Sequence, residues 1–454
     1  MVTVTGANSS GMNTKTECEE SPVSTDKASG WAVFWFAVAL GLLTHGAYWA
    51  LDREHYTVDT ASYLIPADNL AHGLGFVNEL HEPELRRTPG YPLVLALFGT
   101  KPLRVEYLID AQHMLCIATA ASVALIGWRL SGSKVVALVS AAVLALDLAT
   151  IRIANLLMTE VVAMVLIGLA AWSLYRGMAS DARRIKWIIA AGLLGGCAAM
   201  VRPVGSLYFL GLAMCLVLGL RRRTIRPVMV LAMSFLLLSA IWATRNYVEA
   251  GYFGISTIGA ENILYYRAAG ALAVQQPGSY FENARRMNTI FIEQTCPDLE
   301  RMYRRGCSDI NEKQQASYAT HKGTSIILRH PWGYAESAGL SLAYIVFGGG
   351  TEALSRVTNL GPKTAKFIVL FVTIPEALLA VAGCWYWFRR DGNLFYVLVI
   401  TVGYFFVVSA GAEAYSRFRV PVMPMYALLV GGGAEWMIET IRRAVSVTPI
   451  GTRP

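Results

Sequence analysis

The sequence predicts an all-α polytopic membrane protein, and three observations carry that prediction. Of the 454 residues, 55% are hydrophobic and only 15% are charged, whereas soluble domains average about a quarter charged residues. The apolar residues fall in runs long enough to cross a bilayer as helices. The positive charges gather in short links between these runs, a pattern typical of cytoplasmic links, so we expect no nucleic-acid partner despite a net charge of +8.

Ten apolar runs are expected to span the membrane. They lie at about 31–51, 104–128, 135–151, 157–175, 187–201, 203–220, 227–243, 366–388, 394–411 and 421–438. Placing the basic links in the cytoplasm puts the N-terminus there as well. The stretch 335–354 is apolar enough to be a further span, but that would move the basic 388–390 outside. We therefore expect a re-entrant or surface-lying helix there.

These spans divide the chain into five parts. Residues 1–30 are polar and rich in Ser, Thr and Gly, which is typical of a disordered cytoplasmic tail. An N-terminal transmembrane module at 31–243 contains the first outer loop, 52–103. A large periplasmic loop (244–335), a C-terminal transmembrane module (336–440) and a cytoplasmic tail (441–454) follow.

Two of the seven cysteines, Cys296 and Cys307, stand together in the large outer loop, in "TCPDLERMYRRGC". The others lie in the tail or within spans. A pair of cysteines in an oxidising compartment favours a bond that closes a small loop. We therefore predict a disulfide between them rather than two free thiols.

Charged residues stand near the outward ends of the spans. The segments are "DREHY" (52–56), "RRTPGYP" (86–92), "ANLLMTE" (154–160), "VRPVG" (201–205), "WATRNYVEAGYF" (242–253) and "GAEAYSRFRVPVMP" (411–424). Ionisable groups at this depth are costly unless they pair or serve a function. Because all of them lie on one side of the membrane, the sequence predicts a single outer-face cavity that holds carboxylates and guanidiniums.

That set of side chains fits one chemistry well. Arginines bind phosphate through paired hydrogen bonds, and a nearby carboxylate can take the proton of an incoming hydroxyl or amine. Breaking a sugar–phosphate bond needs both functions. Because the cavity faces lipid, a polyprenyl-phosphate-linked sugar is the donor that this arrangement favours, with membrane lipids around it.

Six segments carry a resemblance to a known family. They are "YTVDTASYLIPADNLAHGLGF", "RRTPGYPLVLAL", "MTEVV", "AAMVRPVG", "WATRNYVEAGYFGIST" and "SRFRVPVMPMYALL", in this order. From about residue 31 to 440 the chain resembles the bacterial GT-C glycosyltransferases of the dolichyl-phosphate-mannose–protein mannosyltransferase type, which include the lipid A aminoarabinose transferases. The ordered set is specific for the superfamily and says little about the substrate.

The resemblance implies a bundle of about ten transmembrane helices with juxtamembrane helices on its outer face. It also implies a multi-pass protein of the bacterial inner membrane whose active site faces the periplasm. The implied reaction is an inverting transfer of a monosaccharide from a polyprenyl-phosphate donor to a lipid, glycan or protein acceptor of the cell envelope.

The family carries its proposed catalytic base in the first outer loop, and the matching position is Asp59, in the spacing Asp59, Tyr63, Ala67. Residues four apart share a helix face, so Asp59 and Tyr63 would face the same space. The alternative is that Asp59 caps the helix that begins "TASYL". Asp52 and Glu54 in the same loop are alternative bases.

The resemblance implies that Glu160 is a second catalytic carboxylate of the cavity. Its role would be to orient the acceptor or an arginine. The alternative is that Thr159 and Glu160 complement the start of a helix. Arg202 lies between two spans, where an unpaired charge is costly. We expect it to pair with a phosphate or with an acid such as Glu160.

Further phosphate or substrate ligands are expected at the other span ends, namely Arg86, Arg87, Arg245, Glu413, Arg417 and Arg419. For Arg86 and Arg87 ordinary headgroup contact is the alternative, and the Arg245 segment can also serve as an interfacial anchor. In an extended stretch before Pro421, Arg417 and Arg419 would point the same way. Of these two, we favour Arg417 as the phosphate ligand.

No cofactor is expected, because the histidines lack the paired spacing of a zinc site. A divalent cation at the carboxylates stays open but is not favoured. Two other function classes also stay open. A membrane transporter would show inverted repeats and charges near the bilayer midplane, and a lipid-linked glycan ligase or polymerase would consume a lipid-linked oligosaccharide.

Overall fold

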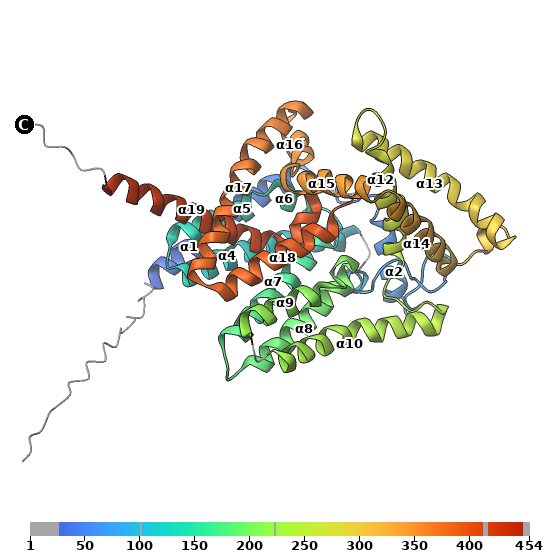
Figure 1. Ribbon diagram of the computed structural model, residues 1–454, viewed down its shortest axis with the longest axis horizontal. Coiled ribbons are helices and arrows are strands. Elements are labelled where there is room, and N and C mark those ends of the chain that lie inside the picture. The colour runs from blue at the N-terminus through green and yellow to red at the C-terminus, as the bar shows by residue number, and fades with distance from the viewer. Residues whose placement is uncertain (1–26, 100–101, 222–223, 412–415, 448–454) are drawn as a thin grey trace, which may run out of the picture.

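A computed structural model describes residues 27–99, 102–221, 224–411 and 416–447, and no β-strand occurs in this part of the chain (Figure 1). Within it, eight helical segments are long and apolar enough to cross a membrane, or nine if one bent pair counts as a span. The eight are α1 (Lys27–Leu51), α4 (Pro102–Ser131), α7 (Glu160–Ala179), α8 (Arg184–Val201), η1 (Pro203–Gly205) together with α9 (Tyr208–Leu220), α10 (Ile225–Ala250), α17 (Pro362–Arg390) and α18 (Gly392–Ser409).

The bent pair and α19 (Met423–Val447) complete the bundle of about ten helices that the sequence predicts. Glycines and two glutamates lower the hydropathy of α19, yet its first half is buried among other helices. It packs on α17 so closely that a Cβ on Gly383 or Gly433 would collide with the carbonyl oxygen of Leu429 or Leu379. The predicted all-α membrane bundle is confirmed.

The third span, predicted as a single run over about 135–151, is bent and extends to Ala154. It consists of α5 (Lys134–Leu146) and α6 (Leu148–Ala154), which meet at 52°. Asp147, between them, has an extended backbone, and its carboxylate accepts hydrogen bonds from the amide and the hydroxyl of Thr150. This cap starts a new helix in a new direction. The same carboxylate pairs with Arg419.

Short helices of the first outer loop lie across one end of the bundle. They are α2 (Ala61–Ala71) and α3 (Gly90–Phe98). Gly90 sits against the backbone of Met200, where a Cβ would lie 2.6 Å from the carbonyl oxygen, so α3 packs directly on the end of α8. This end, where α7 begins and α8 stops, is called the cavity end below.

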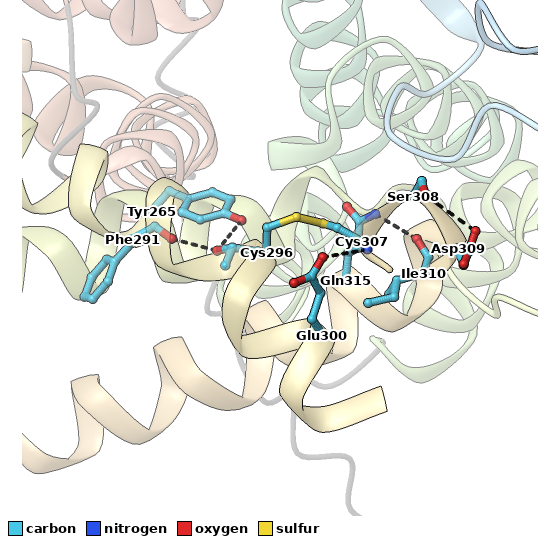
Figure 2. The surroundings of a disulfide bond; sticks show 10 residues. Tyr265, Phe291, Cys296, Glu300, Cys307, Ser308, Asp309, Ile310 and Gln315 are labelled. Atoms are coloured by element: carbon cyan, nitrogen blue, oxygen red, sulfur yellow. Dashed lines mark hydrogen bonds between the residues drawn. A yellow bond between two sulfur atoms is a disulfide. The ribbon is translucent and has the colours of Figure 1, made fainter. Parts of the chain in front are cut away.

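Helices between residues 258 and 329 form a unit with its own hydrophobic cluster, here called the cap. Its elements are α11 (Ile258–Glu261), the π-helix η2 (Asn262–Ala268), α12 (Ala269–Ala273), α13 (Tyr280–Tyr303), η3 (Cys307–Asp309) and α14 (Glu312–Arg329). Figure 1 places α12, α13 and α14 together at one side of the bundle. A disulfide between Cys296 and Cys307 ties α13 to η3, and Glu300 accepts a hydrogen bond from the Cys307 amide beside it (Figure 2).

The ambiguous stretch 335–354 contains parts of two helices, α15 (Pro331–Phe347) and α16 (Thr351–Thr358), separated by three glycines. Neither is among the helices long and apolar enough to span a membrane in the described part of the chain. At Gly349 a Cβ would lie 2.7 Å from the guanidinium of Arg419. The glycine turn therefore lets this segment close over the short helix η4 (Ser416–Val422).

Replacing Arg419 with Met tests the buried pair that fixes the bend at Asp147. Both side chains are at most 4% exposed, and a buried carboxylate without its cation destabilises a fold by about 3–5 kcal/mol. We expect R419M to lower the free energy of unfolding in detergent by that amount, measured by denaturant titration. R443M removes the cation of an exposed pair on α19 and should change it by less than about 1 kcal/mol. Equal effects of the two variants would contradict the argument.

Candidate active site

A cavity of about 360 Å³ opens at the cavity end, between the first outer loop, α7, η1, η4 and the cap. Among the described residues, its lining contains five arginines and three carboxylates, which come from parts of the chain far apart in sequence. The eight are Asp59, Arg86, Arg87, Glu160, Arg202, Glu261, Arg267 and Arg417. The lining therefore carries an excess of two positive charges, which favours an anionic ligand.

Asp59 lies in the turn before α2 and reaches into this cavity. Its two carboxylate oxygens pair with Arg87 Nη2 at 3.0 Å and with Arg417 Nη1 at 3.3 Å. Asp59 does not cap the helix with its side chain, because the N-cap position belongs to Thr60. The capping alternative thus gives way to ion pairing inside the cavity.

Tyr63 and Arg87 hold that carboxylate in place. Arg87 donates hydrogen bonds to the hydroxyl of Tyr63 and to that of Ser62, each at 2.9 Å, and its guanidinium lies 4.3 Å from the centre of the Tyr63 ring. One helix turn therefore presents Asp59 and Tyr63 to the same arginine, as their spacing predicts. The side chain of Arg87 is only 10% exposed.

Glu160 forms a second pair deeper in the cavity. Its side chain is 0% exposed and meets Arg202 Nη1 at 2.5 Å. Thr159 makes no side-chain cap. Its hydroxyl instead donates to Glu160 Oε2 and accepts from Arg202. The helix start therefore positions an ion pair, and Arg202 has the acidic partner that its place between two spans predicts.

Arg417 links the two carboxylates. Besides its contact with Asp59, its Nε lies 3.9 Å from Glu160 Oε1. It belongs to η4, a 3-10 helix, whereas the sequence predicts an extended stretch there. The prediction that Arg417 and Arg419 point the same way is therefore wrong, because the helical turn sends Arg419 to Asp147 and to the carbonyl oxygen of Val346.

Arg86 joins the first outer loop to the cap. Its Nε and Nη2 donate to the two carboxylate oxygens of Glu261 at 2.8 and 3.0 Å. The hydroxyl of Ser256 donates to the backbone carbonyl oxygen of Arg86. This bidentate ion pair is the strongest geometry available to an arginine and a carboxylate. It holds the cap over the cavity.

Arg267 is a cavity residue that the sequence analysis does not select. It lies on η2 and donates to the carbonyl oxygen of Val408 at 2.5 Å. Its Nε is buried and has no hydrogen-bond partner among the described residues, and no carboxylate there pairs with it. An arginine inside the otherwise apolar "NILYYRAAGAL" is the signal that could have found it.

Two predicted ligands lie outside this lining. Arg245 donates to the carbonyl oxygens of Phe76 and Glu84 at 2.7 and 3.2 Å, so it fixes the backbone of the first outer loop. Arg419 is buried against Asp147, as described above. The sequence predicts both because it shows a charge at a span end, but it does not show whether a carbonyl, an acid or a cavity receives that charge.

The alternative bases also have other partners. Asp52 and Glu54 both pair with Arg152 of α6, at 3.0 and 2.9 Å, and neither lines the cavity. Glu413 lies outside the described residues. Within those residues, no group of three or more His, Cys, Asp and Glu side chains could hold a metal ion.

Arg417 and Arg87 hold the pKa of Asp59 below its ordinary value. Burial by itself would raise that pKa, but the attraction of the two guanidiniums and their hydrogen bonds outweighs it. Asp59 is therefore an anion at neutral pH. By contrast, burial raises the pKa of Glu84, a loop carboxylate outside the lining.

Comparison with solved structures identifies the architecture. The oligosaccharyltransferase of Archaeoglobus fulgidus in its apo form superposes with a TM-score of 0.51 at 13% identity, over 95% of this chain and 53% of that chain. The same enzyme tethered to an acceptor peptide with the NVT sequon gives 0.50 at 12% identity, over 94% and 52%. The chain has a GT-C fold. It spans about half the length of those oligosaccharyltransferases.

A second GT-C protein also aligns with the chain. ArnT from Cupriavidus metallidurans bound to undecaprenyl phosphate gives a TM-score of 0.41 at 14% identity, over 93% of this chain and 80% of that chain. No protein-family model and no curated protein matches the sequence. At these identities the likeness to the oligosaccharyltransferases shows the GT-C fold, and the chemistry rests on the residues of the cavity.

Replacing Arg417 with Gln should raise the pKa of Asp59. In the wild-type protein the ionised carboxylate stabilises the fold above its ordinary pKa of 3.8, and this contribution is lost as the pH falls through the lower folded-state value. In R417Q, Arg87 alone opposes the rise that burial causes in the pKa of Asp59. The pH at which this carboxylate takes up its proton therefore increases. Infrared titration of the carboxyl band measures it, with D59N to assign the band. If Asp59 titrates with the same midpoint in R417Q as in the wild type, Arg417 does not lower its pKa.

Proposed function

We propose that this chain is an inverting glycosyltransferase that moves a monosaccharide from a polyprenyl-phosphate donor to an acceptor of the cell envelope. The observation that supports it is the placement of Asp59 beside Arg417 in a cavity with an excess of positive charge. The transfer needs a base for the acceptor and positive charge for the phosphate. The carboxylate and the guanidiniums of this pocket are groups of these two kinds.

The charge of the lining suits the leaving group better than the donor. A sugar linked through a lipid phosphate carries a single negative charge, whereas the free phosphate monoester carries about −1.5 to −2 at pH 7. The two excess positive charges therefore favour the state in which the sugar–phosphate bond has broken. Arg417 and Arg267 are the ligands that we assign to this phosphate, with Arg202 beside them.

Asp59 takes the proton of the acceptor. The acceptor oxygen or nitrogen attacks the anomeric carbon, the bond from that carbon to the phosphate oxygen breaks, and the proton passes to the carboxylate. A phosphate that binds Arg417 competes with Asp59 for it, which raises the pKa of Asp59 and makes it a better base. A single displacement of this kind inverts the anomeric centre.

The arrangement of the basic links supports an outward-facing cavity. Helix α7 runs from Glu160 in the cavity to Ala179, and α8 runs back from Arg184. Two basic links therefore lie at the end opposite to the cavity. One contains Arg183 and has Lys186 beside it, and the other, before α18, contains Arg389 and Arg390. Because such links stay in the cytoplasm, we place the cavity at the periplasmic face of a bacterial inner membrane.

A lipid-linked glycan ligase is the second candidate, because the matched GT-C proteins with the higher TM-scores are oligosaccharyltransferases. The two functions differ in the donor. A purified enzyme that transfers sugar from a polyprenyl monophosphate monosaccharide, and not from a lipid diphosphate oligosaccharide, has the proposed function. The opposite preference would select the ligase. Mass spectrometry of envelope glycolipids with and without the protein identifies the sugar and the acceptor.

Replacing Asp59 with Asn should nearly abolish transfer without weakening donor binding, because Arg417 loses the carboxylate that competes with the phosphate. Loss of a general base slows a reaction by about 10²–10⁴-fold, whereas the arginines that bind phosphate remain in place. The measurement is the turnover of purified protein with a polyprenyl-phosphate sugar, together with the dissociation constant of the donor.

Asp68 supplies the matched control for this variant. It is a carboxylate on α2, is 48% exposed and pairs with His72 outside the cavity lining. D68N should keep the wild-type turnover. If D59N were as active as the wild type, Asp59 would not be the base.

Replacing Arg417 with Ala should instead weaken donor capture. Hydrogen bonds to charged groups contribute about 1.5–3 kcal/mol, so the dissociation constant for polyprenyl phosphate should rise by about 10- to 100-fold. Equilibrium binding in detergent measures it. Arg356 contacts Glu54 of the first outer loop but does not line the cavity, so R356A is the control. Wild-type affinity in R417A would contradict the assignment.

A further inference from the structure

Three neutral polar side chains line the charged cavity. They are Thr88 of the first outer loop, Asn262 at the start of η2 and Ser409 at the end of α18. Thr88 and Ser409 are only 3% and 5% exposed, yet none of the three side chains forms a hydrogen bond with another described residue. We infer that these groups bind the hydroxyls of the donor sugar, and that this sugar is neutral, without amino or carboxyl groups. The inference rests on the proposed function and names its substrate class.

The charged groups of the lining already have partners, which disfavours a charged sugar. Each of the three carboxylates pairs with an arginine among the described residues, so none is left for the ammonium of an amino sugar. The excess of positive charge would also repel that ammonium. A sugar carboxylate would need a guanidinium without an acidic partner, and we assign Arg267, which is such a group in the described part of the chain, to the phosphate. Two hydroxyls and an amide both donate and accept hydrogen bonds, so they fit uncharged sugar hydroxyls.

Two of the three groups stand beside the phosphate ligands and the base. In the proposed reaction the sugar lies between the phosphate and Asp59. Ser409 directly follows the residue whose carbonyl oxygen accepts a hydrogen bond from Arg267, so it is next to a phosphate ligand. Thr88 directly follows the arginine that pairs with Asp59. A sugar that joins the phosphate to the base therefore lies within the part of the cavity to which both hydroxyls belong.

The cap contributes Asn262 and open space beside it. Asn262 begins the π-helix η2, which also carries Arg267, and π-helical turns occur frequently at functional sites. Gly259 stands three residues before Asn262, so the two share a helix face, and both line the cavity. A Cβ on Gly259 would meet nothing within 4 Å. The cap therefore leaves room for a sugar ring beside the amide of Asn262.

Donor analogues that differ only in the sugar test the inference. Polyprenyl phosphate esterified with glucose, mannose, galactose or arabinose carries a neutral sugar, whereas the glucosamine and glucuronic acid esters carry a charged one. A methyl ester has the same phosphate charge and no sugar. The measurement is the dissociation constant of each probe for the purified full chain.

We expect at least one neutral-sugar probe to bind about 10-fold or more tightly than the methyl ester, because each hydrogen bond to an uncharged group contributes about 2- to 10-fold. The glucosamine and glucuronic acid probes should bind no more tightly than the methyl ester, because their charged groups find no partner in the cavity.

The variants T88V, N262A and S409A remove the three groups one at a time. Each should weaken binding of the favoured neutral-sugar probe by about 2- to 10-fold, the effect of one hydrogen bond, and should leave the affinity for the methyl ester unchanged. T88V and S409A remove a hydroxyl with little change of shape, so they keep the test open if N262A disturbs η2. Gln294 is the matched amide control, because it is exposed on α13 and lies outside the cavity lining. Q294A should bind every probe as the wild type does.

The outcomes that overturn the inference are distinguishable from failure of the proposed function. If a charged-sugar probe binds most tightly, the sugar class is wrong and the proposed function stands, because that donor is also a sugar on a lipid monophosphate. If the three variants bind the neutral-sugar probe as the wild type does, or lose affinity for the methyl ester equally, these side chains do not bind the sugar. If no sugar ester binds more tightly than the methyl ester, the cavity does not recognise the sugar. If the wild type binds neither the esters nor free polyprenyl phosphate, the proposed function fails as well.

Discussion

Ion pairing between arginines and carboxylates at membrane depth is the constraint on which the cavity depends. Charged groups there are costly unless each finds a partner, and the partners come from distant parts of the chain. Arg417 contacts both Asp59 and Glu160, and Arg202 closes the second pair. The first outer loop, α7 and η4 can therefore meet only in an arrangement that completes these contacts. The pairs fix the geometry of the site before any substrate arrives.

In the proposed transfer, the same pairing would let a closed set of charges serve the reaction. A buried acid with two cations is stable but is a weak base, as the lowered pKa of Asp59 shows. An arriving phosphate offers the arginines another anion and leaves the carboxylate less compensated. Under the proposed function, binding of the lipid phosphate and activation of Asp59 as the base are one event. Arg267 has no carboxylate partner in the described part of the chain, so under the proposed function it offers the phosphate a first contact that breaks no pair.

The cap and the bend at Asp147 show how local chemistry positions this site. Arg86 binds Glu261 across the boundary between the first outer loop and the cap, and the disulfide between Cys296 and Cys307 holds the far part of the cap together. Asp147 ends one helix, caps the next and binds Arg419. These contacts keep η4 against the bundle, which places Arg417 at the cavity.

Hydropathy and spacing by themselves determined the helical membrane bundle and the face-sharing of Asp59 and Tyr63, because both follow from local periodicity and the cost of burying polar groups. The tertiary structure decided which charges meet. Arg202 and Arg417 enter the cavity, whereas Arg245 binds backbone carbonyls and Arg419 binds Asp147. All four look alike as arginines at span ends. The bend of the third span and the 3-10 turn of η4 set the directions of Arg417 and Arg419, and these depend on contacts that join residues hundreds of positions apart.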